Sequence, residues 1–151
     1  MFILELIVRK FMVKVPEEVK KMAVEAVSKR TCVFGTTNKK CIPNAVPMST
    51  RGYPKVLDDD KFVMIDNFLD KTRKNLEENP FATITFWNPE TLEGYQVKGP
   101  VEIKSSGDLY ERIKSEIHAK RPDLPVKAIV ILRVEEIYNI KPGSEAGKRI
   151  A

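Results

Sequence analysis

The stretch that decides the fold is KFVMIDNFLDKTRKNLEENP, residues 61–80. It opens with Phe62-Val63-Met64-Ile65, an apolar run that is typical of a buried strand. A short helix is predicted from about Lys71 to Asn79, and Pro80 ends it because the residue before a proline is disfavoured in the helical conformation. The segment therefore predicts a strand that passes within a few residues into a helix.

The flanking segments are mostly strands joined by short turns. Two further helices are predicted. Pro16 to Ser28 has Pro16 at its first helical position and a stripe of Val19, Met22, Ala23, Ala26 and Val27, and Gly107 to Lys120 has a stripe of Leu109, Ile113 and Ile117. The predicted strands are Thr31–Thr37, Cys41–Thr50, Lys55–Leu57, Lys61–Asp66, Phe81–Trp87, Tyr95–Ser105 and a run within Lys127–Ile140. Because strands follow strands, we expect a six- to seven-stranded antiparallel barrel, mainly β with peripheral helices, rather than a doubly wound parallel sheet.

Length and composition limit the classes of protein that the chain can represent. Its 151 residues and 17.2 kDa predict a single domain over 1–151, with 1–11 as an N-terminal extension and 141–151 as a flexible tail. With 26 basic and 21 acidic side chains the net charge is +5, which favours anionic partners in general. One histidine and two cysteines exclude zinc fingers, HExxH metalloproteases and disulfide scaffolds.

The apolar opening, Met1 to Val8, contains Glu5 and is much shorter than the ~20 residues that span a bilayer. Its positive charges, Arg9 and Lys10, follow the apolar run, whereas in a secretory signal they precede it. We therefore expect a peripheral strand or an extension rather than a signal or anchor, no membrane association, and a cytoplasmic protein.

The two cysteines flank a predicted turn with Asn38-Lys39 at its tip. In that register Cys32 faces position 45 and Cys41 faces Thr36, so no cross-strand disulfide is expected and both remain free thiols. The second arm of the hairpin contains Pro43 and Pro47, which cannot donate to a ladder of hydrogen bonds. That arm should therefore lie at a sheet edge or run past a ligand.

A candidate anion site lies at the start of the helix predicted from Lys71. The first turn of a helix leaves backbone N–H groups unpaired and has partial positive charge. Thr72 adds a hydroxyl, Asn75 adds an amide one turn later, and Lys71 adds a positive charge. These groups could cradle a phosphate without a glycine-rich loop, although Thr72 could equally serve as an N-cap residue.

The order of several motifs gives this site a context. They are Thr36–Asn44 with Val46-Pro47-Met48-Ser49, then Val56 to Asp60, Asp66-Asn67, Lys71-Thr72-x-x-Asn75-Leu76-x-x-Asn79-Pro80, and Gly94 to Ile103. Over about Pro16 to Ile137 this order resembles the FMN-binding split β-barrel family that is named after pyridoxamine 5′-phosphate oxidase. The likeness is to its small single-domain FMN-binding proteins.

The resemblance implies a non-covalent FMN cofactor and a site for it. Lys71, Thr72 and Asn75 would hold the flavin phosphate, Pro47, Met48 and Ser49 would lie along the ring, and Ile65, Asp66 and Asn67 would line the ribityl chain and the pyrimidine side. It also implies a homodimer with the flavin at the subunit interface, where Trp87 and Gln96 of the partner's hairpin would complete the site. The implied function is electron or hydride transfer, with NAD(P)H or a redox protein as a candidate partner.

The sequence departs from the family pattern in two places. Cys41-Ile42-Pro43 replaces the usual glycine before the proline, and Arg51-Gly52-Tyr53-Pro54 is unusual beside the ring. The arginine and histidine set that binds the substrate phosphate of the oxidase has no clear counterpart, which favours flavin binding over pyridoxamine phosphate oxidation. Sequence leaves open whether the protein is an enzyme or a carrier, which substrate a flavin-dependent reductase or oxidase would take, and whether a deazaflavin replaces FMN.

The remaining motifs give little support to a catalytic histidine, a metal site or a nucleic-acid-binding surface. His118 has no partner in sequence and is interpreted as a surface histidine, and aspartates 58–60 as a solvated turn rather than a metal site, because the ligand spacing and loop glycine of a calcium site are lacking. Trp87 could also be an ordinary core or interface aromatic. A nucleic-acid-binding barrel is suggested only by charge, since basic and aromatic residues do not interleave as in an RNA-recognition strand.

Overall fold

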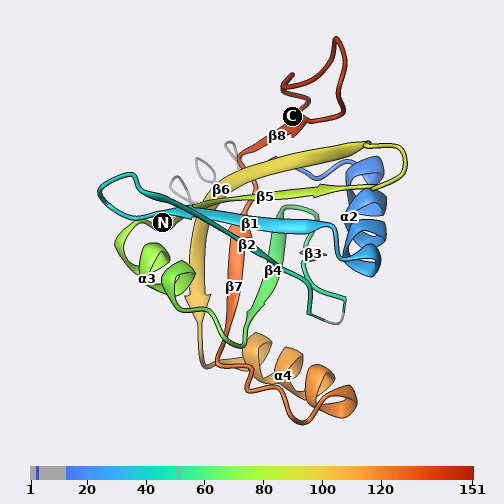
Figure 1. Ribbon diagram of the computed structural model, residues 1–151. Coiled ribbons are helices and arrows are strands. Elements are labelled where there is room, and N and C mark those ends of the chain that lie inside the picture. The colour runs from blue at the N-terminus through green and yellow to red at the C-terminus, as the bar shows by residue number, and fades with distance from the viewer. Residues whose placement is uncertain (1–2, 4–12, 51) are drawn as a thin grey trace.

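The computed structural model describes residues 3, 13–50 and 52–151. The predicted N-terminal extension, apart from residue 3, lies outside the described residues. The helices and strands run, in chain order, α2 (Glu17–Lys29), β1 (Cys32–Thr37), β2 (Pro43–Pro47), β3 (Lys55–Leu57), β4 (Lys61–Asp66), α3 (Lys71–Glu78), β5 (Phe81–Trp87), β6 (Gly94–Lys104), α4 (Asp108–Lys120), β7 (Ala128–Arg133) and β8 (Glu136–Asn139) (Figure 1). In these ranges no helix has the length and apolar character that crossing a membrane requires.

The strands form one antiparallel sheet in the order β2-β1-β5-β6-β7-β4-β3, and β8 pairs with β6 outside this path. Because β2 and β3 end the path and are not neighbours in it, the sheet curls without closing (Figure 1). The predicted antiparallel split barrel is confirmed. The eighth strand arises because the run predicted within Lys127–Ile140 divides into β7 and β8.

The long strand β6 joins the two halves of the barrel. Its first residues pair with β5 on one side and β8 on the other, and from Val101 onward it pairs with β7. Gly99 lies at the changeover, where a Cβ atom would be 1.7 Å from the carbonyl oxygen of Arg133. Only glycine permits so close an approach between the two backbones.

Two apolar clusters explain why the deciding stretch does not alternate between apolar and polar residues. Phe62 and Met64 of β4 pack inside the barrel, whereas Val63 and Ile65 pack on the opposite face against α4. Strand β7 is divided in the same way between the two clusters. A strand that is buried on both faces is apolar at every position, as residues 62–65 are.

The helices follow their predicted stripes with two adjustments. All five stripe residues of α2 are buried, but Pro16 is the N-cap residue and the helix begins at Glu17, so the placement of Pro16 at the first helical position was wrong by one residue. In α4 the buried residues are Tyr110, Ile113 and Ile117, whereas Leu109 is half-buried.

The register predicted for the β1–β2 hairpin was wrong. Thr37 pairs with Pro43 and Val33 with Pro47, so Cys32 does not face position 45 and Cys41 does not face Thr36. The reason is a longer turn, in which the side-chain oxygen of Asn38 accepts from the amides of Lys40 and Ile42 at 2.9 and 3.0 Å. Both cysteines are free, as expected, with Cys32 buried and Cys41 exposed in the turn. Strand β2 lies at a sheet edge, as its prolines predict.

The chain after β8 turns back along that strand. The amide of Ile137 donates to the carbonyl of Ala151 at 3.1 Å, and the amide of Ile150 donates to Ile137 at 2.8 Å. The tail predicted to be flexible, residues 141–151, therefore ends in backbone hydrogen bonds to the barrel, although its side chains are mostly exposed.

Candidate functional site

A cavity of about 480 Å³ lies between the end of β2, the end of β4 and the start of α3. Strand β2 contributes its edge, and the passage from β4 to α3 contributes the facing wall. Seven of the eleven predicted site residues line the cavity: Pro47, Met48, Ser49, Ile65, Asn67, Lys71 and Thr72. The structure thus brings together three segments that the sequence singled out separately.

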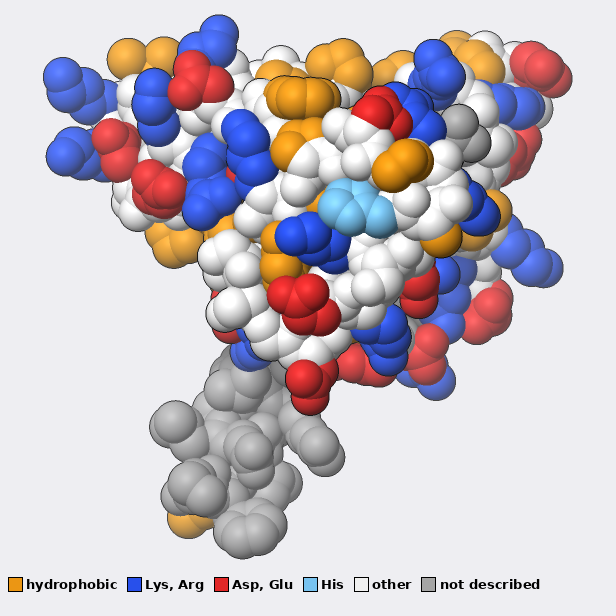
Figure 2. All heavy atoms as spheres, turned by 90° about the horizontal axis from the view of Figure 1, so that it is seen from below, with side chains coloured by type: hydrophobic (Ala, Val, Ile, Leu, Met, Phe, Trp, Pro, Cys, Tyr) orange, Lys and Arg blue, Asp and Glu red, His pale blue; other side chains and the backbone are white. Residues whose placement is uncertain are grey.

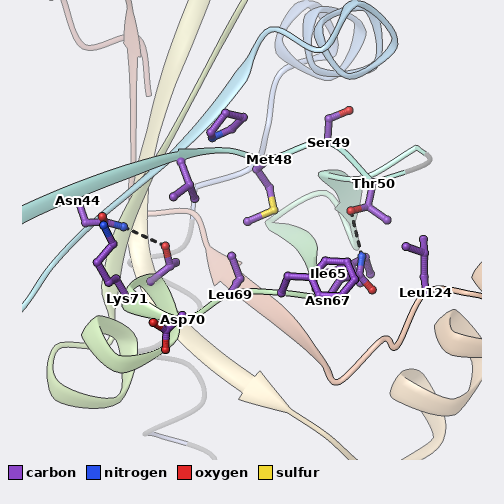
Figure 3. Close-up of a pocket in the computed structure, with 14 residues that line it drawn as sticks. Asn44, Met48, Ser49, Thr50, Ile65, Asn67, Leu69, Asp70, Lys71 and Leu124 are labelled. Atoms are coloured by element: carbon purple, nitrogen blue, oxygen red, sulfur yellow. Dashed lines mark hydrogen bonds between the residues drawn. The ribbon is translucent and has the colours of Figure 1, made fainter.

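One end of the cavity is polar and is formed by the start of α3 (Figure 3). The amide of Asn44 donates to the Thr72 hydroxyl at 3.1 Å. The Lys71 side chain makes no ion pair or hydrogen bond among the described residues, and Asp70 pairs with Lys74 at 3.0 Å. The N-cap residue is Asp70 rather than Thr72, and its side chain makes no capping bond. Within the part of the chain that the structure describes, the first turn of α3 therefore keeps unpaired N–H donors beside an ammonium group without a partner.

Two predicted ligands hold the wall of the cavity and do not line it. Asp66 is 1% exposed and accepts from the amide of Leu69 at 3.0 Å and from Arg73 Nη1 at 2.8 Å. That hydrogen bond is the main cause that raises the pKa of Arg73. Asn75 is buried and donates to the Thr36 hydroxyl at 3.1 Å. Asp66 thus fixes the strand-to-helix passage, and Asn75 fixes α3 against β1.

The opposite end of the cavity is formed by residues near Thr50 and Leu124 (Figure 3). Asn67 connects its walls, because its amide donates to the Thr50 hydroxyl at 3.3 Å and its oxygen accepts from the Val126 amide at 3.0 Å. The Ser49 hydroxyl donates to the carbonyl of Val27 at 3.2 Å. Between the two ends the surface is mainly apolar, with Met48 and Ile65 buried in the floor.

Trp87 and Gln96 lie away from this cavity. They are on β5 and β6, and Gln96 pairs with Thr85, to whose hydroxyl its amide donates at 3.5 Å. Both side chains are half-buried. Within one chain, therefore, neither Trp87 nor Gln96 lines the cavity.

Seven lining residues were missed at the sequence level: Asn44, Val46, Thr50, Phe68, Leu69, Asp70 and Leu124. A signal existed for two of them, because Asn44 and Val46 alternate in β2 with the exposed Pro43, Ala45 and Pro47. Leu124 gave no signal, since it comes from the connection between α4 and β7, far away in sequence.

His118 lies near the site but outside the cavity. It is half-buried, and its Nε2 atom is 2.7 Å from the carbonyl oxygen of Leu124. Figure 2, in which the histidine is pale blue, shows it at the surface among side chains of both charge signs. The interpretation as a surface histidine agrees with this position.

The chain is similar to proteins of one known family over most of its length. The family model described as pyridoxamine 5′-phosphate oxidase matches residues 16–141. An uncharacterized protein of Methanocaldococcus jannaschii is 37% identical over 142 residues, which cover 92% of this chain and 89% of that protein.

Solved structures agree with the fold. HupZ of Group A Streptococcus aligns with a TM-score of 0.71 and 30% identity, over 88% of this chain and 99% of HupZ. An FMN-binding protein from Syntrophomonas wolfei subsp. wolfei aligns with a TM-score of 0.64 and 18% identity, over 91% of this chain and 90% of that one. At 18% identity the second likeness shows the fold alone.

Proposed function

The chain belongs to the pyridoxamine 5′-phosphate oxidase family, and from that premise we propose that it binds FMN non-covalently in the cavity between β2, β4 and α3. The observation that carries the proposal is the polarity of that cavity. At one end lies an uncapped helix start with Lys71, whose ammonium group has no partner among the described residues, and an apolar surface leads away from it. A flavin nucleotide needs an anion site for its phosphate and, further along the cavity, an apolar surface for its ring system.

The residues present fit the cofactor. The first-turn amides of α3, the Lys71 ammonium and the Thr72 hydroxyl would hold the phosphate. Met48, Ile65 and the backbone of Pro47 to Ser49 would lie along the ring system, and Asn67 would face the ribityl chain or the pyrimidine edge. The volume of about 480 Å³ lies within the range of ordinary cofactor pockets. Bound FMN would supply the redox chemistry, and the protein would bind, orient and shield it.

We also propose a homodimer that completes the site. A second, largely apolar groove of about 580 Å³ crosses the outer face of β1, β2, β5 and β6. Thr83 points into this region, and its buried hydroxyl has no hydrogen-bond partner among the described residues. Gln96 and Trp87 follow on the same outward side of the β5–β6 pair, in the register Thr83–Lys98, Thr85–Gln96 and Trp87–Gly94. A second copy on this face would cover the groove and bring its own Trp87 and Gln96 towards the cofactor.

The first test is the phosphate end. Lys71→Ala should weaken FMN binding by about tenfold or more, because a hydrogen bond to a charged group contributes about 1.5–3 kcal/mol. Riboflavin binding should be unchanged, because riboflavin lacks the phosphate. Flavin fluorescence quenching measures both. Lys21→Ala, an exposed residue of α2 outside the cavity, removes the same charge and serves as the control. Equal losses for FMN and riboflavin, or a chain that binds no FMN, would contradict the proposal.

The same preparation distinguishes an enzyme from a carrier. Rapid reduction of bound FMN by NADH or NADPH would favour a flavin-dependent reductase, whereas inertness to both would favour an electron carrier served by a redox protein. Absorbance of the flavin under anaerobic conditions follows the reduction directly.

A further inference from the structure

A second cavity, of about 590 Å³, adjoins the proposed flavin site. The two cavities share Ser49, Thr50 and Leu124. Figure 3 shows these three residues at the end of the first cavity that is away from Lys71. The second cavity therefore opens beside the region where the flavin ring would lie rather than beside the phosphate.

The second cavity is lined by two arginines, Arg30 and Arg121, and no carboxylate is among its described lining residues. Arg121 is held by Asp123, whose carboxylate accepts from its Nε and Nη2 atoms at 2.8 and 2.6 Å. Arg30 has no side-chain hydrogen bond or ion pair in the described ranges. The pair of Arg121 with Asp123 is close to neutral, so Arg30 supplies the uncompensated positive charge.

The backbone at Arg30 is a second observation. Arg30 ends α2 in the left-handed conformation, with φ 60° and ψ 36°. Glycine is the usual residue at such a helix end, because a side chain there is disfavoured. Glycine at this position would therefore relieve the backbone and remove the guanidinium that lines the second cavity, which makes the two effects separable by one substitution.

We propose that this cavity binds the anionic group, a phosphate or a carboxylate, of the small molecule that exchanges electrons with the flavin. The inference rests on the proposed function, because it places the substrate beside the flavin ring. Arg30 would form charge-assisted hydrogen bonds to the anion, and its planar guanidinium suits two oxygens at once. The hydroxyls of Ser49 and Thr50 stand between the two cavities, where the neutral part of the molecule would pass towards the ring.

The experiment uses FMN-loaded protein and isothermal titration calorimetry. Adenosine 2′,5′-bisphosphate is the phosphate probe, citrate is the carboxylate probe, and adenosine is the uncharged control. At least one anion should bind to the wild-type protein, and adenosine should bind much more weakly. Arg30→Gly should weaken the preferred anion about tenfold or more, as expected for loss of a charged hydrogen-bonding group. Arg30→Lys, which keeps the charge, should retain part of the affinity.

The effects of Arg30→Gly on protein stability and on anion binding can be measured separately. Arg30→Gly should leave the melting temperature unchanged or raise it, since glycine relieves the left-handed backbone. FMN retention should also be unchanged, and Lys21→Ala should leave anion binding as it is. An FMN-loaded protein that binds neither anion, or an Arg30→Gly variant that loses FMN and anion alike, would overturn the inference. A chain that binds no FMN at all contradicts the proposed function and this inference together.

Discussion

Thr72 and Asn75 show how residues in one motif divide into binding and structural tasks. Both were predicted as phosphate ligands, but Thr72 accepts a hydrogen bond from Asn44, and Asn75 donates one to Thr36. Substituting either would disturb the docking of α3 on the β1–β2 hairpin as well as any phosphate contact, because a partner would be left unsatisfied. Lys71 has no such second task among the described residues, which makes it the residue that tests the site alone.

The two cysteines differ in burial, and this difference predicts how each thiol reacts. Burial raises the pKa of the Cys32 thiol to about 12, whereas Cys41 is exposed. Because the thiolate is the reactive form, Ellman's reagent at about pH 8 should modify one thiol per chain in the native protein and two in denaturant. Cys41→Ser should react only after unfolding, and rapid modification of the native Cys41→Ser protein would contradict the assignment.

The raised pKa also gives a pH dependence. Ionisation of Cys32 favours the unfolded state, whose thiol titrates near the ordinary value of 9.0. The neutral Cys32 thiol therefore makes its full contribution to the free energy of unfolding below pH 9, and this contribution is lost as the pH rises towards 12. Over this range the free energy of unfolding should fall more steeply for the wild-type protein than for Cys32→Ala.

At the scale of elements, β6 determines whether the barrel can form. Gly99→Ala should destabilise the protein by about 3 kcal/mol or more. The added Cβ would lie 1.7 Å from the carbonyl oxygen of Arg133. Because that oxygen belongs to the backbone, it could move away only if the two halves of the barrel separated there. Urea unfolding measures the change. Gly35→Ala is the comparison, since the close contact of its Cβ would be with a side-chain atom, the Thr83 methyl carbon at 2.8 Å, whereas the nearest backbone atom, the Thr83 oxygen, would be at 3.9 Å. Equal losses of stability at the two glycines would contradict the special role of the close approach at Gly99.

Elements were predictable where local chemistry alone decides them. The β3–β4 hairpin has the predicted bounds because an apolar run meets a turn of three aspartates. The register of β1 and β2 was not predictable in the same way, because the side chain of Asn38 bonds back to the turn and lengthens it. Strand β8 was merged with β7 because no glycine or proline separates them, although the charged residues Arg133, Glu135 and Glu136 interrupt the apolar run.

The candidate site was predictable to the extent that its residues are close in sequence. The passage from β4 to α3 and the end of β2 have clear local signals, namely an apolar strand that meets a helix start and an edge strand that contains prolines. Leu124 and the second cavity depend on how α2 and α4 end beside the barrel. That arrangement results from packing of distant segments, which periodicity and spacing do not describe.

At the scale of the whole molecule, the proposed homodimer can be tested at the exposed Ala45 in the outer groove. Ala45→Arg would place a charge in an apolar groove without touching the core, so light scattering should show a monomer instead of a dimer. FMN affinity should fall with it if the partner completes the site. Ala119→Arg, at an exposed position of α4 outside the groove, is the matched control and should remain dimeric. A wild-type monomer that holds FMN fully would contradict the dimer proposal.

The sharing of β6 between the two strand systems has a consequence for how the chain can be divided. One system takes β1, β2, β5 and β8, and the other takes β3, β4 and β7, so each draws on early and late parts of the chain. A fragment that ends before Ala128 would leave β4 and the last residues of β6 without the strand between them. No single cut therefore yields two self-sufficient pieces, and the smallest autonomous unit is nearly the entire barrel.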